Sequence, residues 1–261
     1  VDGSIKAMYI MGENPAMSDP NLNHTRTAFT RLEHLVVQDI FFTETAGFAD
    51  VILPASAFPE KTGSFTNTDR RVQIGRQAID PPGDAKQDLW IIQELAKRFG
   101  LTWNYKNVEA VYDELREAND SISGISWQLL MEHDSLTYPF TSSKEESETV
   151  LFKEFFPTAS GKARFVSAEY SKADELPDES FPFIFITGRQ LEHWHTGSMT
   201  HRSRVLKSLE PEAVVNLNPS DMEAIGCNEH QPLTIESRRG QLTATVRADF
   251  RIQVGPIFMA F

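Results

Sequence analysis

The sequence predicts an α/β protein in which a doubly wound parallel-sheet domain is followed by a small β-barrel domain. Residues 6–100 alternate between apolar runs of strand length and amphipathic helical segments, the pattern of a parallel sheet with crossover helices. From residue 181 onward, short apolar strands and turn residues surround one small helix, which is typical of a compact barrel. At 261 residues, the chain is long enough for two domains that each bury their own core.

The elements of the first domain are predicted from strand ends and helix periodicity. The first strand closes at the turn of residues 12–15, and the third is stopped by Pro54, which has no N–H to continue a central ladder. In the last helix, apolar residues recur at the spacing of one buried face before the stop at Gly100. The expected strands are residues 6–11, 35–37 and 51–53, and the expected helices are residues 21–32, 43–48 and 88–99.

The rest of the chain divides into a helical segment and a β-rich region. Asn218 as cap and Pro219 as first helical residue begin a short helix that ends at Gly226. Around Arg238-Arg239-Gly240, two apolar runs predict a hairpin. The other expected elements are helices near residues 108–115 and 125–131, a polar linker at 141–149, and strands at 183–186, 214–217, 233–237 and 242–247. The predicted domains are residues 1–105, 106–180 and 181–261.

Charge and cysteine content restrict the function classes. The formal net charge is 25 − 37 = −12, which disfavours nucleic acid or an anionic membrane as a partner. No stretch reaches the length of a membrane span and no leader opens the chain, so we expect a cytoplasmic protein without membrane contact. Cys227, the single cysteine, can form neither an internal disulfide nor a thiolate cluster, and we expect it to be a small buried residue at a helix end.

Two further features bear on the site and on completeness. Arginines cluster at residues 70, 71 and 76 and again at 202 and 204, where they could hold an anion or form solvated surface. The chain begins at Val1 and stops at Phe261 inside an apolar run that has the composition of a core strand. We therefore expect a fragment whose first domain is partial and whose last domain is incomplete at its C-terminus.

The first candidate constellation is Gly12-Glu13-Asn14, directly after the first strand. Glycine lets the backbone pass close to a ligand, whereas Glu13 and Asn14 offer an acceptor and a mixed donor and acceptor. In open α/β sheets, ligands bind beyond the carboxyl ends of the strands. The alternative is an ordinary turn.

The second constellation occupies residues 38–69. Asp39 at a strand end can accept two parallel hydrogen bonds from ribose hydroxyls or a guanine edge, and Gln38 precedes it. The segment from Thr43 to Thr45 starts a helix, where free N–H groups favour an anion such as pyrophosphate. A loop then carries Glu60, Gly63, Asn67 and Asp69. The alternative for each residue is a cap or a turn.

The third constellation is the run of residues 187–200, TGRQLEHWHTGSMT. Arg189 is a fork donor suited to a phosphate or a ring carbonyl. His193 and His195, with His201, would fit a metal, but no cysteine or carboxylate completes the site, so packing or hydrogen bonding is the better default. Near a cofactor, His193 would donate a hydrogen bond and Trp194 would provide a stacking wall.

These three constellations, in this order, resemble the C-terminal half of the molybdopterin oxidoreductases, above all the large (alpha) subunit of molybdenum or tungsten formate dehydrogenases. The run at residues 187–200 is most similar to the cytosolic NAD-coupled type. The resemblance covers nearly the whole chain and is weakest over residues 101–150. It implies that the barrel is a molybdopterin dinucleotide-binding domain and that the chain binds bis-(molybdopterin guanine dinucleotide).

The resemblance also implies site residues from both domains. No catalytic or metal-ligating residue is expected here, because the family's iron–sulfur cysteines and its Cys or selenocysteine metal ligand lie upstream. The residues implied to line one nucleotide-pterin arm are Gly12, Glu13, Asn14, Gln38, Asp39, Thr43, Glu60, Gly63 and Asp69. Those implied to contact pterin from the barrel are Arg189, Gln190, His193, Thr196, Ser198 and Met199.

The resemblance implies a formate dehydrogenase that passes electrons from formate through [4Fe-4S] clusters, bound outside this chain, to NAD on a partner subunit. Implied partners are the iron–sulfur and flavin subunits of such a complex and the remainder of the alpha subunit itself. This part alone is expected to be inactive. The alternatives are a nitrate reductase of the same superfamily, and a scaffold without cofactor such as the large iron–sulfur subunit of respiratory complex I.

Overall fold

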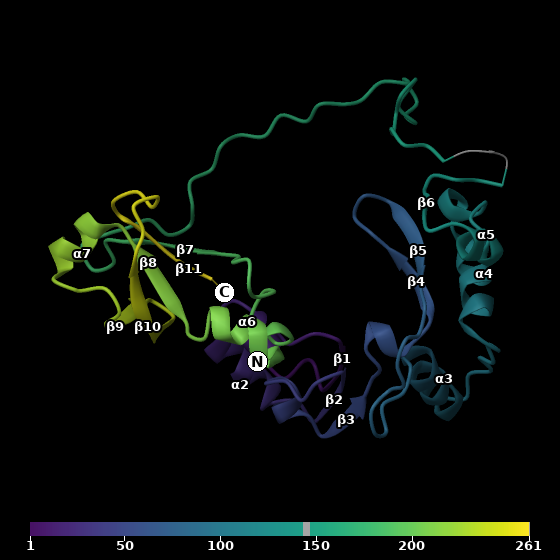
Figure 1. Ribbon diagram of the computed structural model, residues 1–261, viewed down its shortest axis with the longest axis horizontal. Helices are drawn as coiled ribbons and strands as arrows, with labels where there is room; N and C mark the ends of the chain where they lie inside the picture. The colour runs from purple at the N-terminus through teal and green to yellow at the C-terminus, as the bar shows by residue number, and fades with distance from the viewer. Residues whose placement is uncertain (143–146, 261) are drawn as a thin grey trace. The chain divides into compact units, whose positions relative to one another are not determined.

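A computed structural model of the chain describes residues 1–142 and 147–260. It contains two compact units, one formed by Val1–Ile52 with Tyr170–Phe261 and the other by Leu53–Glu169. In the first unit, β1 (Ala7–Met11) pairs in parallel with β2 (His34–Asp39), with Ala7 opposite His34 (Figure 1). The third strand of this sheet is β3 (Val51–Pro54), which lies beside β2. The three predicted strands are thus confirmed.

Short helices pack on this sheet because their apolar residues face it. The helices are α1 (Pro15–Ser18), α2 (Leu22–Phe29) and the 3-10 helix η1 (Ala46–Phe48). The predicted helices at residues 21–32 and 43–48 are therefore present but shorter than expected. The core of the sheet is formed by Ile10, Ala16, Phe29, Leu35, Val37 and Ala46.

The C-terminal part of the first unit is a mixed five-stranded sheet in the order β7-β11-β8-β10-β9. Strands β9 and β10 form the predicted antiparallel hairpin, whereas β10 with β8 and β11 with β7 are parallel pairs. Among the described residues the edge strands β7 and β9 do not pair, so the predicted barrel is present as an open sheet. The strands are β7 (Ile184–Gly188), β8 (Val214–Leu217), β9 (Pro232–Ser237), β10 (Gly240–Ala248) and β11 (Pro256–Ala260).

Three helices accompany this sheet: η4 (Thr200–Arg202), α6 (Arg204–Leu209) and α7 (Pro219–Ile225). The last begins as predicted, because the Asn218 side chain accepts a hydrogen bond from the Ser220 N–H at 2.9 Å. It ends at Gly226, whose φ of +72° is the left-handed conformation that glycine adopts without strain. Cys227 follows, half-buried, and packs against the core of the sheet.

The second unit differs most from the sequence-based prediction. The stretch predicted as a loop contains the antiparallel hairpin of β4 (Gly63–Thr66) and β5 (Arg71–Gly75), extended by β6 (Leu136–Thr137). Its glycine, asparagine and aspartate residues predict turns, and its strands of four and five residues are too short for a clear alternation of apolar and polar residues. The other elements are η2 (Phe58–Glu60), α3 (Asp88–Arg98), α4 (Val108–Ala118), η3 (Asp120–Ile122) and α5 (Trp127–Glu132).

Helices α3, α4 and α5 confirm the three helices predicted between residues 88 and 131. The core of this unit is formed by Val72, Tyr112, Ile122, Ile125 and Leu130. Part of the predicted polar linker at residues 141–149, namely 143–146, lies outside the described residues. In the part of the chain that the structure describes, no helix is both long and apolar enough to cross a membrane.

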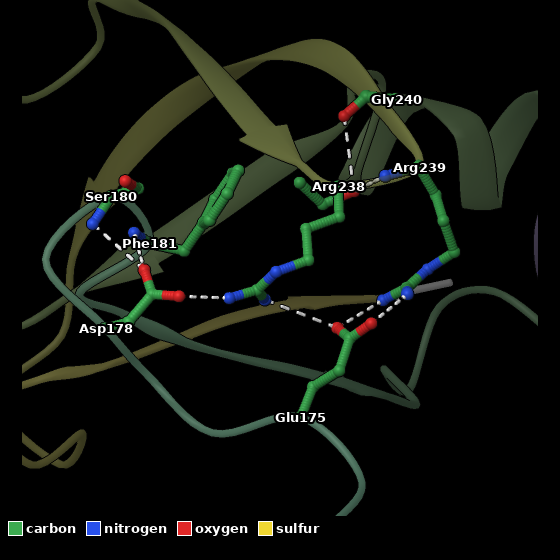
Figure 2. A network of polar contacts seen from close by, with 8 residues as sticks. Glu175, Asp178, Ser180, Phe181, Arg238, Arg239 and Gly240 are labelled. Carbon is green, nitrogen blue, oxygen red and sulfur yellow. Dashed lines mark hydrogen bonds and ion pairs between the residues drawn. The ribbon is translucent and has the colours of Figure 1, made fainter.

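An ion-pair network fastens the segment before β7 to the β9–β10 turn (Figure 2). The Arg239 guanidinium donates two hydrogen bonds to the Glu175 carboxylate, at 2.5 and 2.9 Å. Arg238 is paired with Asp178 and lies 4.6 Å from the centroid of the Phe181 ring. The turn thus holds residues 175–181 on its surface.

Candidate functional site

The loop after β1 is joined to the end of β2. Gly12 has a φ of +64°, and its N–H donates a hydrogen bond to the Gln38 carbonyl at 2.8 Å. A Cβ added at Gly12 would meet no atom within 4 Å, so the backbone here is open to a close approach. Glu13 beside it is exposed.

Asn14 is the centre of a buried polar cluster that connects three segments. Its side chain is only 7% exposed. The Nδ2 amide donates to Glu44 Oε2 at 2.7 Å and to Ser198 Oγ at 2.8 Å. Its Oδ1 accepts from the Thr45 N–H at 3.1 Å and from the Thr45 hydroxyl at 2.8 Å. All four hydrogen-bonding positions of the amide are therefore used within the protein.

Asp39 is the last residue of β2, and Thr43 lies on the segment that follows it. The Asp39 carboxylate is half-buried and accepts a hydrogen bond from the Phe41 N–H at 3.1 Å. Gln38 is fully buried, and its Oε1 accepts from the Tyr9 hydroxyl. The Thr43 hydroxyl accepts a hydrogen bond at 3.2 Å from the N–H of Ala46, the first residue of η1.

The predicted site residues of the C-terminal part lie on one loop between β7 and η4. Arg189 Nη2 is 3.4 Å from His195 Nε2, and its guanidinium lies 5.5 Å from the centroid of the Trp194 ring. Thr196 Oγ1 is 3.5 Å from Ser198 Oγ, which accepts from Asn14. The other residues predicted here are Gln190, half-buried, and Met199, 49% exposed.

Both ring nitrogens of His193 form hydrogen bonds within the protein. Its Nε2–H donates to the Glu210 carbonyl at 2.8 Å, which leaves Nδ1 to accept from the Thr200 hydroxyl at 3.1 Å. Its ring stacks on that of His201 at 3.8 Å. Burial, with smaller electrostatic contributions from His193 and Lys207, lowers the pKa of His201. Packing and hydrogen bonding thus account for His193, as the default interpretation of these histidines expected. Among the described residues, no group of three or more His, Cys, Asp or Glu side chains is placed to hold a metal ion.

The structure also places a residue that sequence reasoning missed. Arg202 Nη2 donates to the Phe42 carbonyl at 3.0 Å, and Nη1 donates to the Ser198 carbonyl. The guanidinium lies 4.6 Å from the centroid of the Phe41 ring. From the sequence, Arg202 belongs to an arginine cluster with Arg204 that could form solvated surface. Its partner Phe42 lies 160 residues upstream, and no local pattern in the sequence identifies that contact.

Three predicted site residues lie in the second unit. Glu60 Oε2 accepts from the Ala57 N–H at 2.8 Å and caps η2, and Gly63 begins β4. Asp69 is exposed in the β4–β5 turn, where its Oδ1 accepts from the Arg71 N–H at 3.3 Å. Arg70 in the same turn is half-buried and donates to the carbonyls of Glu148 at 3.0 Å and Thr149 at 2.8 Å, so it is not free surface.

Comparison with known proteins identifies the class. Residues 1–98 match the family model described as "Molybdopterin oxidoreductase", and residues 183–261 match the "Molydopterin dinucleotide binding domain". The solved structure of acetylene hydratase from Pelobacter acetylenicus superposes with a TM-score of 0.78 at 21% identity, covering 98% of this chain and 37% of that one, and so shares the fold. The chain belongs to the molybdopterin oxidoreductases.

Several curated relatives are named as formate dehydrogenases. The chain is 41% identical over 260 residues to the F420-dependent formate dehydrogenase subunit alpha of Methanocaldococcus jannaschii, covering 99% of this chain and 38% of the relative. It is 36% identical over 262 residues to a putative formate dehydrogenase of Staphylococcus aureus, covering 99% of this chain and 26% of the relative. The chain thus resembles a portion of a formate dehydrogenase alpha subunit. The NAD-coupled type predicted from the motif is not the type named for the archaeal relative.

Proposed function

We propose that this chain holds the guanine dinucleotide arms of a bis-(molybdopterin guanine dinucleotide) cofactor with molybdenum or tungsten. The observation that carries the proposal is the cluster around Asn14. It joins the loops that follow β1 and β2 to the loop between β7 and η4, 184 residues away in the sequence. Polar groups beyond parallel strands are placed where open α/β sheets bind ligands.

The donor set fits such a ligand. A guanine dinucleotide needs an acceptor for the N–H edge of the base, open backbone, and cationic donors for its phosphates. Asp39 supplies a half-buried carboxylate, Gly12 supplies open backbone, and Arg189 supplies an exposed guanidinium. Arginine forks suit phosphate because two parallel N–H groups can bind two oxygens.

The proposed roles depend on whether the polar groups of each side chain are already hydrogen-bonded within the protein. Gly12, Glu13 and Asp39 would line the dinucleotide from the sheet, and Arg189 and Met199 would face the pterin. Asn14, Thr43, His193 and Ser198 would shape the site through the contacts they make inside the protein. The resemblance adds Gln38, Glu60, Gly63, Asp69, Gln190 and Thr196 to the residues around the cofactor.

The protein that contains this chain would oxidise formate to CO2. The bound cofactor supplies the redox-active metal. The part that this chain contributes would bind the cofactor, orient it and keep water from its nucleotide arms. The proposal also includes partner subunits with iron–sulfur and flavin groups, and [4Fe-4S] clusters bound outside this chain. The protein would lie in the cytoplasm. The proposed domains of the chain are residues 1–105, 106–180 and 181–261.

Two electron acceptors are to be distinguished. The motif at residues 187–200 resembles the NAD-coupled type, whereas the names of the archaeal relatives specify F420. The assay is formate-dependent reduction of NAD and, separately, of F420 by the intact protein with its subunits. Reduction of either acceptor supports formate oxidation and identifies the type. Nitrate reduction without formate oxidation would favour the nitrate reductase alternative, and a purified protein without metal or guanine dinucleotide would favour the scaffold alternative.

A further inference from the structure

Two side chains tie the loop of residues 196–202 to the carboxyl edge of the N-terminal sheet. Asn14 reaches Ser198 Oγ at 2.8 Å, and Arg202 reaches the Phe42 carbonyl at 3.0 Å. The two bonds use different donors and acceptors and meet the loop four residues apart. Together they fix the loop at Ser198 and at Arg202, on either side of Met199, which is one of the barrel residues of the proposed site.

Each of the two side chains contacts both the loop and the segments at the edge of the N-terminal sheet. Asn14 is held on the sheet side by Glu44 and Thr45, so its amide cannot also bind a ligand without losing a protein bond. Arg202 is held on the loop side by the Ser198 carbonyl and on the sheet side by Phe42 and the Phe41 ring. Breaking one of these bonds would leave the other partner unsatisfied.

We infer that Asn14 and Arg202 are positioning residues that order the loop of residues 196–202 before the cofactor binds, rather than residues that contact the cofactor. This inference rests on the proposed function, because that function makes the loop part of the site. A loop that is ordered in advance does not lose conformational freedom when it binds, which favours retention of the ligand.

The loop carries its own reporters of order. Its backbone N–H groups form four internal hydrogen bonds: Gly197 to Trp194, His201 to Gly197, Arg202 to Met199 and Ser203 to Thr200, at 2.9 to 3.1 Å. Protection of these amides from hydrogen exchange measures how long the loop stays closed. The measurement needs neither cofactor nor catalytic activity.

The experiment is hydrogen exchange of residues 197–203 in the intact protein prepared without cofactor. In Asn14→Ala and in Arg202→Ala, protection of these amides should fall by roughly 2- to 10-fold each, the range expected for the loss of one hydrogen bond. Arg204→Ala is the matched control, because Arg204 lies two residues away at the exposed start of α6, and protection should not change.

A second pair of variants guards against general destabilisation. Ser198→Ala removes only the loop's acceptor for Asn14, whereas Ser198→Thr keeps a hydroxyl there. Protection should fall in Ser198→Ala and be restored in Ser198→Thr, a rescue that unfolding alone would not give. In the loaded protein, the guanine dinucleotide should dissociate faster from Asn14→Ala and Arg202→Ala than from Arg204→Ala.

The outcomes separate this inference from the proposed function. Unchanged protection in both Asn14→Ala and Arg202→Ala overturns the inference. The inference is also overturned if Asn14→Ala loses the dinucleotide while protection in the cofactor-free variant is unchanged. Asn14 would then bind the cofactor directly, and the proposed function would stand. Reduced protection in both variants, together with a wild-type protein that binds no guanine dinucleotide, would overturn the proposed function and leave the loop connection in place.

Discussion

Single polar side chains of this protein are buried where they join segments that are distant in sequence. Asn14 and His193 are both less than 8% exposed, and each uses its donors and acceptors on partners inside the protein. A buried polar group costs free energy unless it is hydrogen-bonded. Their burial is therefore explained by the connections they make.

The Glu44 carboxylate gives a pH test of the Asn14 cluster. The hydrogen bond from Asn14, with smaller contributions from Arg202 and Arg26, holds the pKa of Glu44 below its ordinary value of 4.5. A carboxylate whose pKa is depressed in the folded state stabilises that state above its unfolded pKa, and this contribution is lost as the pH falls through the folded pKa.

We therefore expect Glu44→Gln to lower the unfolding midpoint at pH 7, and the difference from wild type to shrink below about pH 4.5. The measurement is denaturant unfolding of both proteins between pH 3 and pH 7. Glu13→Gln, on an exposed side chain nearby, is the control. A difference for Glu44→Gln that is constant with pH would contradict the assigned role.

Tyr112 is the opposite case, a buried polar group without a partner. Its side chain is 3% exposed, and its hydroxyl makes no hydrogen bond in the part of the chain that the structure describes. Burial raises the pKa of Tyr112 to about 12, so the phenol stays neutral. Tyr112→Phe should leave the free energy of unfolding unchanged or raise it by up to about 1 kcal/mol, because an unsatisfied group is removed.

Tyr105→Phe is the matched comparison, because the Tyr105 hydroxyl donates to Glu114 Oε2 at 2.6 Å. That variant should be only slightly destabilised, because an exposed hydrogen bond contributes little to stability. Urea unfolding measures both changes. A loss larger for Tyr112→Phe than for Tyr105→Phe would mean that the buried hydroxyl has a partner.

Among the elements, α7 shows what local sequence can predict. Asn218, Pro219 and Gly226 are capping signals within one short segment, and the helix begins and ends where they predict. The β4–β5 hairpin was missed because Gly63 and Asp69 are also typical of loops, and its pairing with β6 joins residues about 65 apart. The sheet order β7-β11-β8 was equally out of reach, since β11 inserts from the end of the chain.

The C-terminal stop of α7 predicts a specific cost. Gly226→Ala should destabilise the protein by about 1–2 kcal/mol, because an alanine at a φ of +72° is strained even though a Cβ there would meet no atom within 4 Å. Gly47→Ala is the control, since Gly47 has equal space and no positive φ. Thermal unfolding of both variants is the measurement, and equal midpoints would show that the left-handed conformation is not needed.

The β9–β10 turn predicts a change in protease sensitivity. Arg238 and Arg239 hold Glu175 and Asp178 by ion pairs, and backbone N–H groups of Phe181 and Ser180 add hydrogen bonds that lower the pKa of Asp178. Replacing both arginines by alanine should speed tryptic cleavage at Lys172 several-fold, because the segment loses its anchor.

Arg251→Ala provides the control for that cleavage, because the Arg251 side chain pairs, among the described residues, with Asp249 two residues away. Quantitative mass spectrometry of the Lys172 cleavage over time is the measurement. Since the pairs are exposed, cleavage of the wild type should also accelerate at high salt. Equal cleavage in the double variant and the wild type would show that the network does not restrain the segment.

For the whole molecule, the sequence indicated the family and predicted a site with residues from two distant segments, but it did not indicate how these segments contact each other. The resemblance named Asn14 and Ser198 separately as site residues. The structure joins them directly and adds Arg202. Contacts between segments 160 and 184 residues apart leave no periodicity or spacing in the sequence, so only three-dimensional structure reveals them. The chain spans about two-fifths of the length of the archaeal relatives.

The account depends on binding of a guanine dinucleotide with a metal, and that can be measured directly. The intact protein should release guanine dinucleotide on denaturation together with molybdenum or tungsten, quantified by mass spectrometry and metal analysis. Asp39→Ala should retain less of both than wild type, by a factor that corresponds to about 1–3 kcal/mol. Glu179→Ala, at an exposed carboxylate before β7, should retain as much as wild type. A purified protein with neither dinucleotide nor metal, or full retention in Asp39→Ala, would contradict the account.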